Sequence, residues 1–487
     1  MKKSKFVARD SLSTLIKIQL LRDFVDKGSC FKKLCADGYN KPRENLKNAR
    51  PQDLAILLQN KLKLTKSKFP VPEIMVLEKL LDCLFYVSMC KEESDLVKVT
   101  VTLIDPANPD PYPPKKPVAE RWSCVSFEQP IPMTTKALAK LSKAADPCST
   151  TLAVYYQGEE LYIWGMIDQA MHYQNFLNYE SDTDSEQPGL FQVSVNDIGT
   201  LNVLFNYELL ATLKQDSLVK RYLDVLTIGP ISKILKSNAD FLKSAFREYL
   251  EQAHPEEVYL DWKDFLDNLW IQTFSRLLLK IQSYQHGGAI LIHQDGADLD
   301  VKYKIYYKRL AMAMIAHAKA SVDEYVLEKR ISANLKSRKQ SVSKELYRSE
   351  SVTLQLKKGT ADEISGAISF IASQTCVDGV VLFDENMVSN GFGAVLRSKR
   401  MPKKIYRSGT ATATAKSLSP TDPKHYGTRH RSMIAYCWSH PKSLGLVISQ
   451  DGEIRVFSKI DDKLIMWENI KIQQYVKDKK LHNDLRY

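Results

Sequence analysis

The sequence predicts a mixed α/β fold for the C-terminal part of the chain, with a central mixed sheet flanked by helices, preceded by an α+β region and a helical connector. A short apolar run, Val380–Phe383, follows a stretch with helical spacing, Ala361–Gln374, as is typical of a buried strand in a layered sheet. Residues 151–205 contain short β-rich segments joined by tight turns, whereas residues 230–345 show mainly helical spacing.

The length of 487 residues is enough for about three domains, because a single core seldom grows beyond about 250–300 residues. A composition of 44% hydrophobic and 26% charged residues is typical of globular proteins. We expect a helical segment over 1–70, an α+β domain over 71–225, a mainly helical connector over 226–345 and a C-terminal domain over 346–487. The connector could belong to an extended C-terminal domain.

The N-terminal elements follow from local patterns. Helical spacing is present at 12–31, 51–63 and 72–89, the last with proline suited to a first helical position. Repeated prolines at 105–117 predict an extended spacer. Two hairpins are then expected, Thr151–Tyr156 with Glu160–Ile167 and Phe191–Val195 with Leu201–Phe205. The acidic stretch 180–186 predicts a surface loop. Four aromatic residues of this region are more typical of core than of a ligand pocket: Trp122, Tyr155, Tyr162 and Trp164.

The connector is expected to hold three main helices, Phe241–Gln252, Asp261–Gln285 and Tyr307–Arg338. An apolar segment with two leading glycines, 286–296, interrupts them. We favour an extra strand of the C-terminal sheet here over a degenerate copy of the later Val380–Phe383 strand. The basic stretch 329–358 fits either a solvated helix face or a regulatory linker.

A cationic helix start is the most informative motif of the chain. Gly427-Thr428-Arg429-His430-Arg431-Ser432 leads into an amphipathic helix. The first turn of a helix exposes unpaired N–H groups and the positive end of the helix dipole, so each cation there costs roughly 0.3–1 kcal/mol unless an anion is bound. Backbone amides, the Thr428 hydroxyl and two guanidinium groups predict a polyphosphate site, with His430 as a further donor.

Two other pieces complete the candidate site. Asp378 and Gly379 stand at the start of the Val380–Phe383 strand, where a carboxylate can hold a divalent metal and a glycine lets a ligand approach the backbone. Gly391 and Gly393 offer a second close approach. Further on, Ser449 ends a strand that an Asp-Gly turn joins to the next strand.

These three pieces, in this order, resemble the diadenylate cyclase (DAC) domain family over roughly residues 360–460. The resemblance implies condensation of two ATP molecules into cyclic di-AMP and pyrophosphate, with Mg²⁺ or Mn²⁺, where two DAC domains meet face to face. It implies that Asp378 binds the metal and activates the 3′-hydroxyl. By resemblance the triphosphate is held by Thr428, Arg429, His430 and Arg431, of which the last three are catalytic with Asp378, and the nucleotide is lined by Gly379, Ser432 and Ser449. Further candidate substrate contacts are Gly391, Gly393 and Gly427.

Two residues depart from the family pattern. Val380 replaces the usual alanine after Asp-Gly, and Gln450 replaces the acidic residue that usually follows the serine. Asp451 is one position later, and a shift of one residue turns a side chain to the other face of a strand, so metal binding is the role most affected.

The region 71–225 resembles the sensor-like domain that accompanies some prokaryotic DAC domains, notably at Trp164-Gly165 and Pro188-Gly189. Together the resemblances imply a bacterial-type second-messenger enzyme whose activity an unknown ligand of the sensor-like domain regulates.

Two other function classes stay open. A catalytically silent DAC-like domain would bind a nucleotide and signal by shape. A nucleic-acid-binding protein would use the basic charge: the formal net charge is +12, and residues 398–431 carry nine Lys or Arg against one acid, which predicts a mobile basic loop.

The remaining features predict a cytoplasmic protein. The eight cysteines show no CxxC spacing, which argues against a disulfide framework or a zinc cage. No apolar run reaches the length of about 18–20 residues that a membrane span requires, so we expect no membrane partner. The N-terminus also lacks the uninterrupted apolar segment of a secretory signal.

Overall fold

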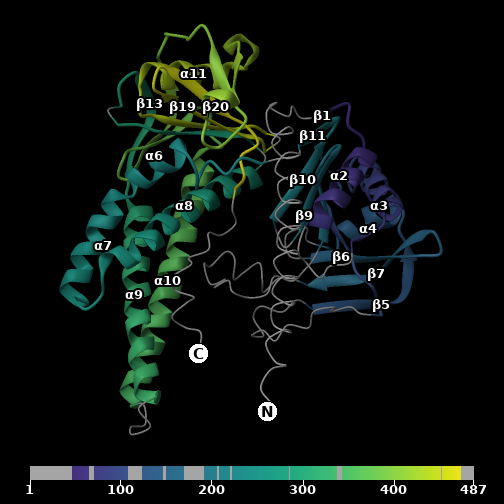
Figure 1. The fold of residues 1–487 in the computed structure, drawn as a ribbon, viewed down its shortest axis with the longest axis horizontal. Coiled ribbons are helices and arrows are strands. Elements are labelled where there is room, and N and C mark those ends of the chain that lie inside the picture. Colours follow the sequence, from purple (N-terminus) through teal and green to yellow (C-terminus); the bar gives the residue numbers. More distant parts are fainter. Residues whose placement is uncertain are drawn as a thin grey trace, which may run out of the picture.

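A computed structural model describes most of the chain and shows a mixed α/β protein with an N-terminal sheet domain and a C-terminal region of helices and sheet (Figure 1). The described residues are 46–64, 71–107, 123–145, 150–168, 191–205, 208–219, 222–284, 286–294, 296–336, 343–450 and 452–472. Several sequence predictions fall outside them: the helix at 12–31, most of the proline spacer, the acidic loop 180–186, Trp122, the pair Pro188-Gly189, and Asp451.

Within the described residues, the N-terminal sheet has nine strands in the order β1-β11-β10-β9-β8-β4-β6-β7-β5. Their bounds are β1 Leu46–Lys47, β4 Val99–Leu103, β5 Ser123–Pro132, β6 Thr150–Gln157, β7 Glu160–Asp168, β8 Phe191–Asp197, β9 Thr200–Phe205, β10 Glu208–Lys214 and β11 Ser217–Val219. A separate short hairpin is formed by β2 Lys91–Glu92 and β3 Asp95–Leu96. Pairing of β6 with β7 and of β8 with β9 confirms both predicted hairpins.

Three helices pack on one face of this sheet: α2 Pro51–Leu64, α3 Ile74–Val87 and α4 Thr135–Ser142. Helix α3 begins at Ile74 after the N-cap Glu73, so the prediction that Pro72 occupies the first turn was wrong. The other face carries buried polar side chains that bond to one another, such as Thr100 to Ser194 at 2.8 Å. Trp164 is 6% exposed and donates from Nε1 to a backbone carbonyl, which confirms a core role for this aromatic residue.

The C-terminal region is a three-layered unit built on a second sheet, which has nine strands in the described part of the chain. Their order is β13-β15-β14-β12-β18-β19-β20-β16-β17. The bounds are β12 Gly288–Ile292, β13 Leu299–Tyr307, β14 Val380–Phe383, β15 Ser389–Leu396, β16 Ile405–Ser408, β17 Leu418–Thr421, β18 Leu444–Ile448, β19 Ile454–Ile460 and β20 Lys463–Trp467. Figure 1 shows one helix, α11, on one side of this sheet and the larger group of helices on the other.

Helices α6–α10 form the larger layer, and α11 Thr428–Ser439 forms the smaller one. The bounds of the larger layer are α6 Pro230–Asn238, α7 Asp240–Ala253, α8 Tyr259–Ser283, α9 Arg309–Lys336 and α10 Lys344–Gln374. Helix α10 begins well before Ala361 because Ser343 caps it, its side chain accepting a hydrogen bond from the Leu346 amide. The basic stretch at its start is therefore helical rather than a linker.

Strand β12 lies in the middle of the second sheet, parallel to β14 and antiparallel to β18. This pairing confirms that residues 286–296 supply a further strand of the sheet, and it places part of the expected connector inside the C-terminal layers. Leu223 and Val225 also belong to this C-terminal core, and Leu223 forms a β-bridge with Ile470. The domain limits themselves stay a prediction.

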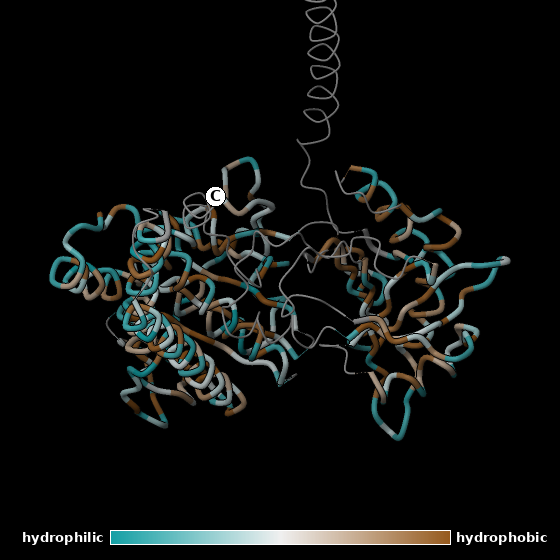
Figure 2. Tube along the Cα trace, turned by 90° about the horizontal axis from the view of Figure 1, so that it is seen from below, coloured by the Kyte–Doolittle hydropathy of each residue, from teal (hydrophilic) through white to brown (hydrophobic). Residues whose placement is uncertain are grey.

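The basic segment 398–431 is folded onto the sheet. Strand β16 pairs with β20 and with β17, and two short 3₁₀ helices follow, Ala415–Ser417 and Pro423–His425. The prediction of a mobile basic loop was therefore wrong, because backbone pairing with β20 fixes the segment. Hydrophobic stretches concentrate in the interior of both halves of the protein (Figure 2). No helix in the described ranges has both the length and the hydrophobicity of a membrane-spanning segment.

Helix α11 lies close to β18 because Gly445 has no side chain. A Cβ built at Gly445 would lie 2.3 Å from Met433 Sδ and 2.9 Å from Cys437 Sγ. Both of these residues are fully buried, so neither can move outward to make room. Gly445 thus sets the position of the helix that carries the cationic start.

We predict that Gly445→Ala lowers the stability of the C-terminal unit by about 1–3 kcal/mol, because the added methyl group overpacks the helix against the strand. The midpoint of urea unfolding, followed by tryptophan fluorescence, measures the change. Gly366→Ala is the matched control: Gly366 is exposed on α10 with open space around it, so alanine there should stabilise the helix by about 0.5–1 kcal/mol. Equal midpoints for the wild type and Gly445→Ala would contradict the packing argument.

Candidate functional site

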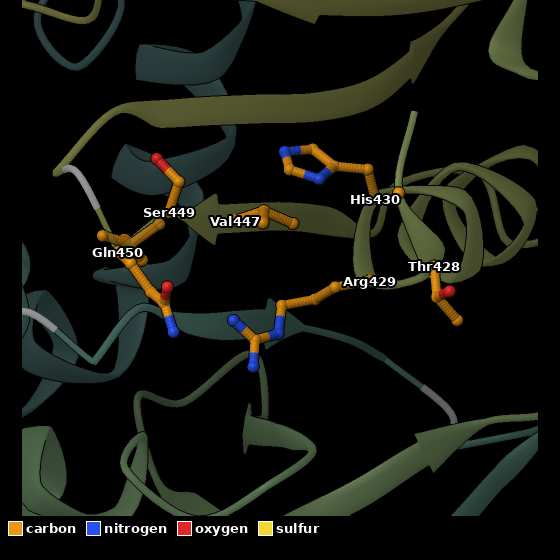
Figure 3. Close-up of a pocket in the computed structure, with 8 residues that line it drawn as sticks. Thr428, Arg429, His430, Val447, Ser449 and Gln450 are labelled. Atoms are coloured by element: carbon orange, nitrogen blue, oxygen red, sulfur yellow. The ribbon is translucent and has the colours of Figure 1, made fainter. Parts of the chain in front are cut away.

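A pocket of about 420 Å³ lies where the N-terminus of α11 meets the C-terminal end of β18 (Figure 3). Its lining residues come from the two segments identified in the sequence: Gly427, Thr428, Arg429, His430, Val447, Ile448, Ser449 and Gln450. Figure 3 shows the Arg429 guanidinium and the Gln450 amide on one side of Val447 and the His430 ring on the other. The fold thus brings together two motifs that are about twenty residues apart in the chain.

The start of α11 has no side-chain cap. Gly427 is the N-cap residue, and the first turn contains no acidic side chain. The amides of Thr428, Arg429 and His430 donate no hydrogen bond to another described residue, whereas the Arg431 amide donates to the Gly427 carbonyl at 3.0 Å. Three N–H groups at the positive end of the helix dipole are therefore available to an anion.

The two arginines of the motif differ in position. Arg429 lines the pocket, and its Nη1 lies 3.2 Å from the point where a Cβ of Gly287 would stand, so the guanidinium rests over that glycine. Arg431 is exposed and does not line the pocket. Neither guanidinium forms an ion pair with another described residue. Two uncompensated positive charges therefore stand at a helix end that favours negative charge.

His430 is held as a neutral acceptor. Burial, together with the nearby Arg455 and Arg429 guanidinium groups, lowers the pKa of His430 to about 4. Arg455 Nη1 lies 3.0 Å from His430 Nε2 and donates to it, which leaves the other ring nitrogen to carry the proton. His430 therefore offers a neutral donor and adds no positive charge to the site.

Arg455 belongs to an ion-pair network behind this histidine. It pairs with Glu453 at 2.7 Å and with Glu468 at 2.9 Å, and the two carboxylates raise the pKa of the guanidinium against the effect of its burial. The sequence analysis missed Arg455, because its role depends on β19 lying next to β18 and β20. The sequence contains one indication of its role: Arg455 is a charged residue between two apolar residues, Ile454 and Val456, of a predicted strand.

Asp378 stands directly before β14, exposed and without an ion pair or hydrogen bond to the described residues. Asp378 and Gly287 each lie just before one of two neighbouring parallel strands, β14 and β12. Because Arg429 rests over Gly287, the carboxylate and the cationic helix start lie at the same edge of the sheet. Adjacent strands are about 4.8 Å apart, so the Asp378 carboxylate and the start of α11 are close enough for one nucleotide to contact both.

The glycines after Asp378 have a structural explanation. Gly379 has φ +123°, and a Cβ on it would lie 2.5 Å from the Gly393 carbonyl carbon. Gly393 has φ +63°, and Gly391 leaves room for Val301 of β13, whose Cγ1 would be 2.5 Å from an added Cβ. These glycines permit close backbone packing within the protein; their contact with a ligand stays a prediction.

Two other predicted residues hold different positions. Ser449 closes the β18–β19 turn, where its hydroxyl accepts from the Glu453 amide at 3.1 Å. Ser432 lies in the first turn of α11, half-buried and outside the pocket lining. Ser449 therefore lines the pocket with a hydroxyl already engaged in the turn.

Strand β13 adds an aromatic surface near Gly393 that the sequence analysis missed. Tyr303 stacks on Phe392 with ring centroids 4.8 Å apart, and its ring lies against Gly393. The strand is at the edge of the sheet, and Tyr303 is 41% exposed. Nothing in the segment 299–307 alone predicts that it pairs with residues almost a hundred positions later.

A metal at this site would rely on Asp378 and a bound ligand. No group of three or more His, Cys, Asp or Glu side chains in the described ranges is arranged to hold a metal ion. Mg²⁺ in nucleotide enzymes is commonly held by one or two carboxylates together with substrate phosphates and water. The exposed Asp378 carboxylate, which does not line the pocket but lies at the same end of the strands, is the described residue that could take this role.

We predict that His430 makes the fold sensitive to acid. Its folded pKa of about 4 is below the ordinary value of 6.5, so as the pH falls through this interval the unfolded chain takes up a proton that the folded chain does not. The loss of melting temperature between pH 7 and pH 5 should be about 2–4 °C smaller in His430→Gln, since glutamine can still accept from Arg455. His425→Gln, at an exposed histidine, is the control, and an identical loss in all three proteins would refute the assignment.

Comparison with known proteins gives one family match. Residues 66–168 match the model of the probable sensor domain DACNV, which confirms the sensor-like region over that range. No curated protein and no solved structure matches the chain. The chain therefore contains a region similar to a DACNV sensor domain, joined to the C-terminal layered unit described above.

Proposed function

We propose that the C-terminal unit is a DAC-type nucleotidyltransferase that condenses two ATP molecules into cyclic di-AMP with release of pyrophosphate. One observation supports this most strongly: an uncapped helix start with two unpaired arginines lies at the same sheet edge as the unpaired carboxylate of Asp378. Phosphate binding and activation of a hydroxyl require these two kinds of group side by side.

The triphosphate would bind at the start of α11. The free amides of the first turn and the Arg429 guanidinium line the pocket, His430 adds a neutral donor, and the exposed Thr428 lies at the same helix start. Charge that develops on the departing pyrophosphate would be stabilised by the arginines and the helix dipole. Nucleotidyl transfer depends mostly on such positioning and charge stabilisation, so no covalent enzyme intermediate is required.

Asp378 would act on the attacking 3′-hydroxyl. Its carboxylate is exposed and unpaired, so it can accept the proton of a hydroxyl or bind Mg²⁺ or Mn²⁺. The metal would supply neutralisation of phosphate charge and polarisation of the phosphoryl group. Gln450 lines the pocket where an acidic residue is usual in the DAC family. The protein therefore provides one carboxylate fewer for a metal ion than the family pattern does.

The reaction requires two copies of the unit. Cyclic di-AMP contains two equivalent linkages, and each pocket holds space for one nucleotide, so two units would face each other and exchange attacking hydroxyls. We infer that the N-terminal domain regulates this pairing, because the DACNV family is a probable sensor domain associated with DAC proteins. A ligand that favours one arrangement of the two units would shift the active population.

A catalytically silent nucleotide sensor is the second candidate. Gln450 in place of an acid and the engaged hydroxyl of Ser449 favour it, since both reduce the number of metal and substrate ligands. This candidate predicts saturable ATP binding without product.

The proposed reaction is tested by incubating the full chain with ATP and Mg²⁺ or Mn²⁺ and measuring cyclic di-AMP by mass spectrometry. We expect product from the wild type, and a loss on the order of 100-fold or more in Asp378→Asn and in the double variant Arg429→Ala/Arg431→Ala. Matched controls are Asp362→Asn and Arg400→Ala, exposed residues away from the pocket that should keep full activity. ATP binding without product in the wild type would favour the silent sensor.

Regulation by the N-terminal domain is tested with a chain that begins at Tyr222. This start keeps Leu223 and Val225, which belong to the C-terminal core, so the truncated unit retains its packing. We expect its specific activity or its association state, measured by light scattering, to differ from that of the full chain. If both quantities are the same under every condition tried, the N-terminal domain does not regulate the enzyme.

A further inference from the structure

A second cavity, of about 500 Å³, lies at the opposite edge of the C-terminal sheet. Strand β18 runs between the two pockets: Pro441 and Lys442 precede its first residue and line the second cavity, whereas Ser449 follows its last residue and lines the first. The five residues of β18 separate the pockets by about 15 Å, so they are distinct sites. The second cavity also borders the carboxyl end of β12, at Ile292 and His293.

The position is one where α/β proteins bind ligands. Strands β12 and β14 are parallel neighbours, and ligands of open α/β sheets bind outside the carboxyl ends of such strands. Residues just beyond both strands line the cavity, His293 directly after β12 and Glu385 two positions after the end of β14. The end of α6, with Asn238, covers it from the helical layer.

The inner part of the cavity contains two largely buried polar side chains, each with a hydrogen-bonding group that contacts no other described residue. Asn238 is 7% exposed, and its amide makes no hydrogen bond to another described residue. His293 is 6% exposed; its Nε2 lies near the Asn390 amide at 3.2 Å, whereas its Nδ1 has no partner among the described residues. The Nδ1 atom of His293 is buried, and leaving such a group unsatisfied costs about 1–3 kcal/mol, so a polar molecule that bonds with it would stabilise the protein.

The rim of the cavity carries charges of both signs. Lys442 and Lys459 provide two ammonium groups, and Glu385 and Asp461 provide two carboxylates. Within the described residues none of the four is in an ion pair; Lys459 instead lies over the Trp438 ring at 4.4 Å. Unpaired charges of opposite sign at one opening match a ligand that itself carries both signs.

Other ligand classes fit this cavity less well. A polyphosphate or a nucleic acid would meet two carboxylates at the opening, and a divalent cation would meet two ammonium groups. A purely apolar ligand would leave Asn238 and His293 unsatisfied. The aliphatic walls, Ile234 and Ile460, suit the carbon skeleton of a small metabolite.

We propose that this cavity is a binding site for a free α-amino acid with a polar side chain. The ligand carboxylate binds a rim lysine, its ammonium group binds a rim carboxylate, and its side chain bonds with Asn238 and His293. The site lies in the same unit as the proposed nucleotide pocket but does not depend on its chemistry.

The test uses the full chain and each of the twenty free amino acids as probes, measured first by thermal shift and then by calorimetry, with AMP as an anionic comparison. We expect at least one polar amino acid to raise the melting temperature and to bind with a measurable Kd. Binding should weaken at least tenfold in Asp461→Ala and in Lys442→Ala, both exposed rim positions whose loss leaves the core intact, and in Asn238→Ala. Arg429→Ala should bind the amino acid as the wild type does.

The proposal fails if none of the twenty amino acids stabilises the protein, if AMP displaces the bound amino acid, or if the rim variants leave amino-acid binding unchanged. Loss of amino-acid binding in Arg429→Ala would assign the ligand to the nucleotide pocket and so also contradict it. Because these measurements involve no ATP turnover, they are independent of whether the unit makes cyclic di-AMP.

Discussion

The electrostatics of one helix end determines the character of the C-terminal unit. Helix α11 begins with two arginines and three amides that pair with no other described residue, an arrangement that is unfavourable without a bound anion. The protein tolerates it because the rest of α11 is anchored: its apolar face is buried on the sheet, and Gly445 lets it lie close to β18. Packing energy from the buried face thus holds the cationic end in place.

The sheet supplies the second half of the site through its strand order. Because β12 lies between β14 and β18, Asp378 before β14 and Arg429 over Gly287 before β12 lie at the same end of neighbouring strands. The helices α8–α10 cover the sheet face opposite α11, and their apolar side chains form a buried core with the strands β12, β14 and β18. At the other edge of the same strands, the order places His293 beside the end of α6, which forms the second cavity. The two pockets therefore lie at opposite ends of the same set of buried strands.

Local patterns predicted much of this structure. The strand Val380–Phe383, the helix that starts at Thr428 and the two N-terminal hairpins all follow from periodicity and turn chemistry within short windows. Other features depend on contacts between distant segments, which no local pattern contains. Strand β13 pairs with β15 across almost a hundred residues, and Arg455 holds His430 neutral from a neighbouring strand. The glycines near Asp378 also permit close packing between strands, as their close backbone and side-chain contacts show, and this second role is not visible in the sequence.

The claim that the start of α11 is a triphosphate site is tested most directly by calorimetric titration of the full chain with ATP and with adenosine. The account predicts that ATP binds at least 100-fold more tightly than adenosine, because the phosphates meet the free amides and arginines, and that Arg429→Ala/Arg431→Ala abolishes this difference. Equal affinities for ATP and adenosine in the wild type, or an unchanged ATP affinity in the double variant, would contradict it.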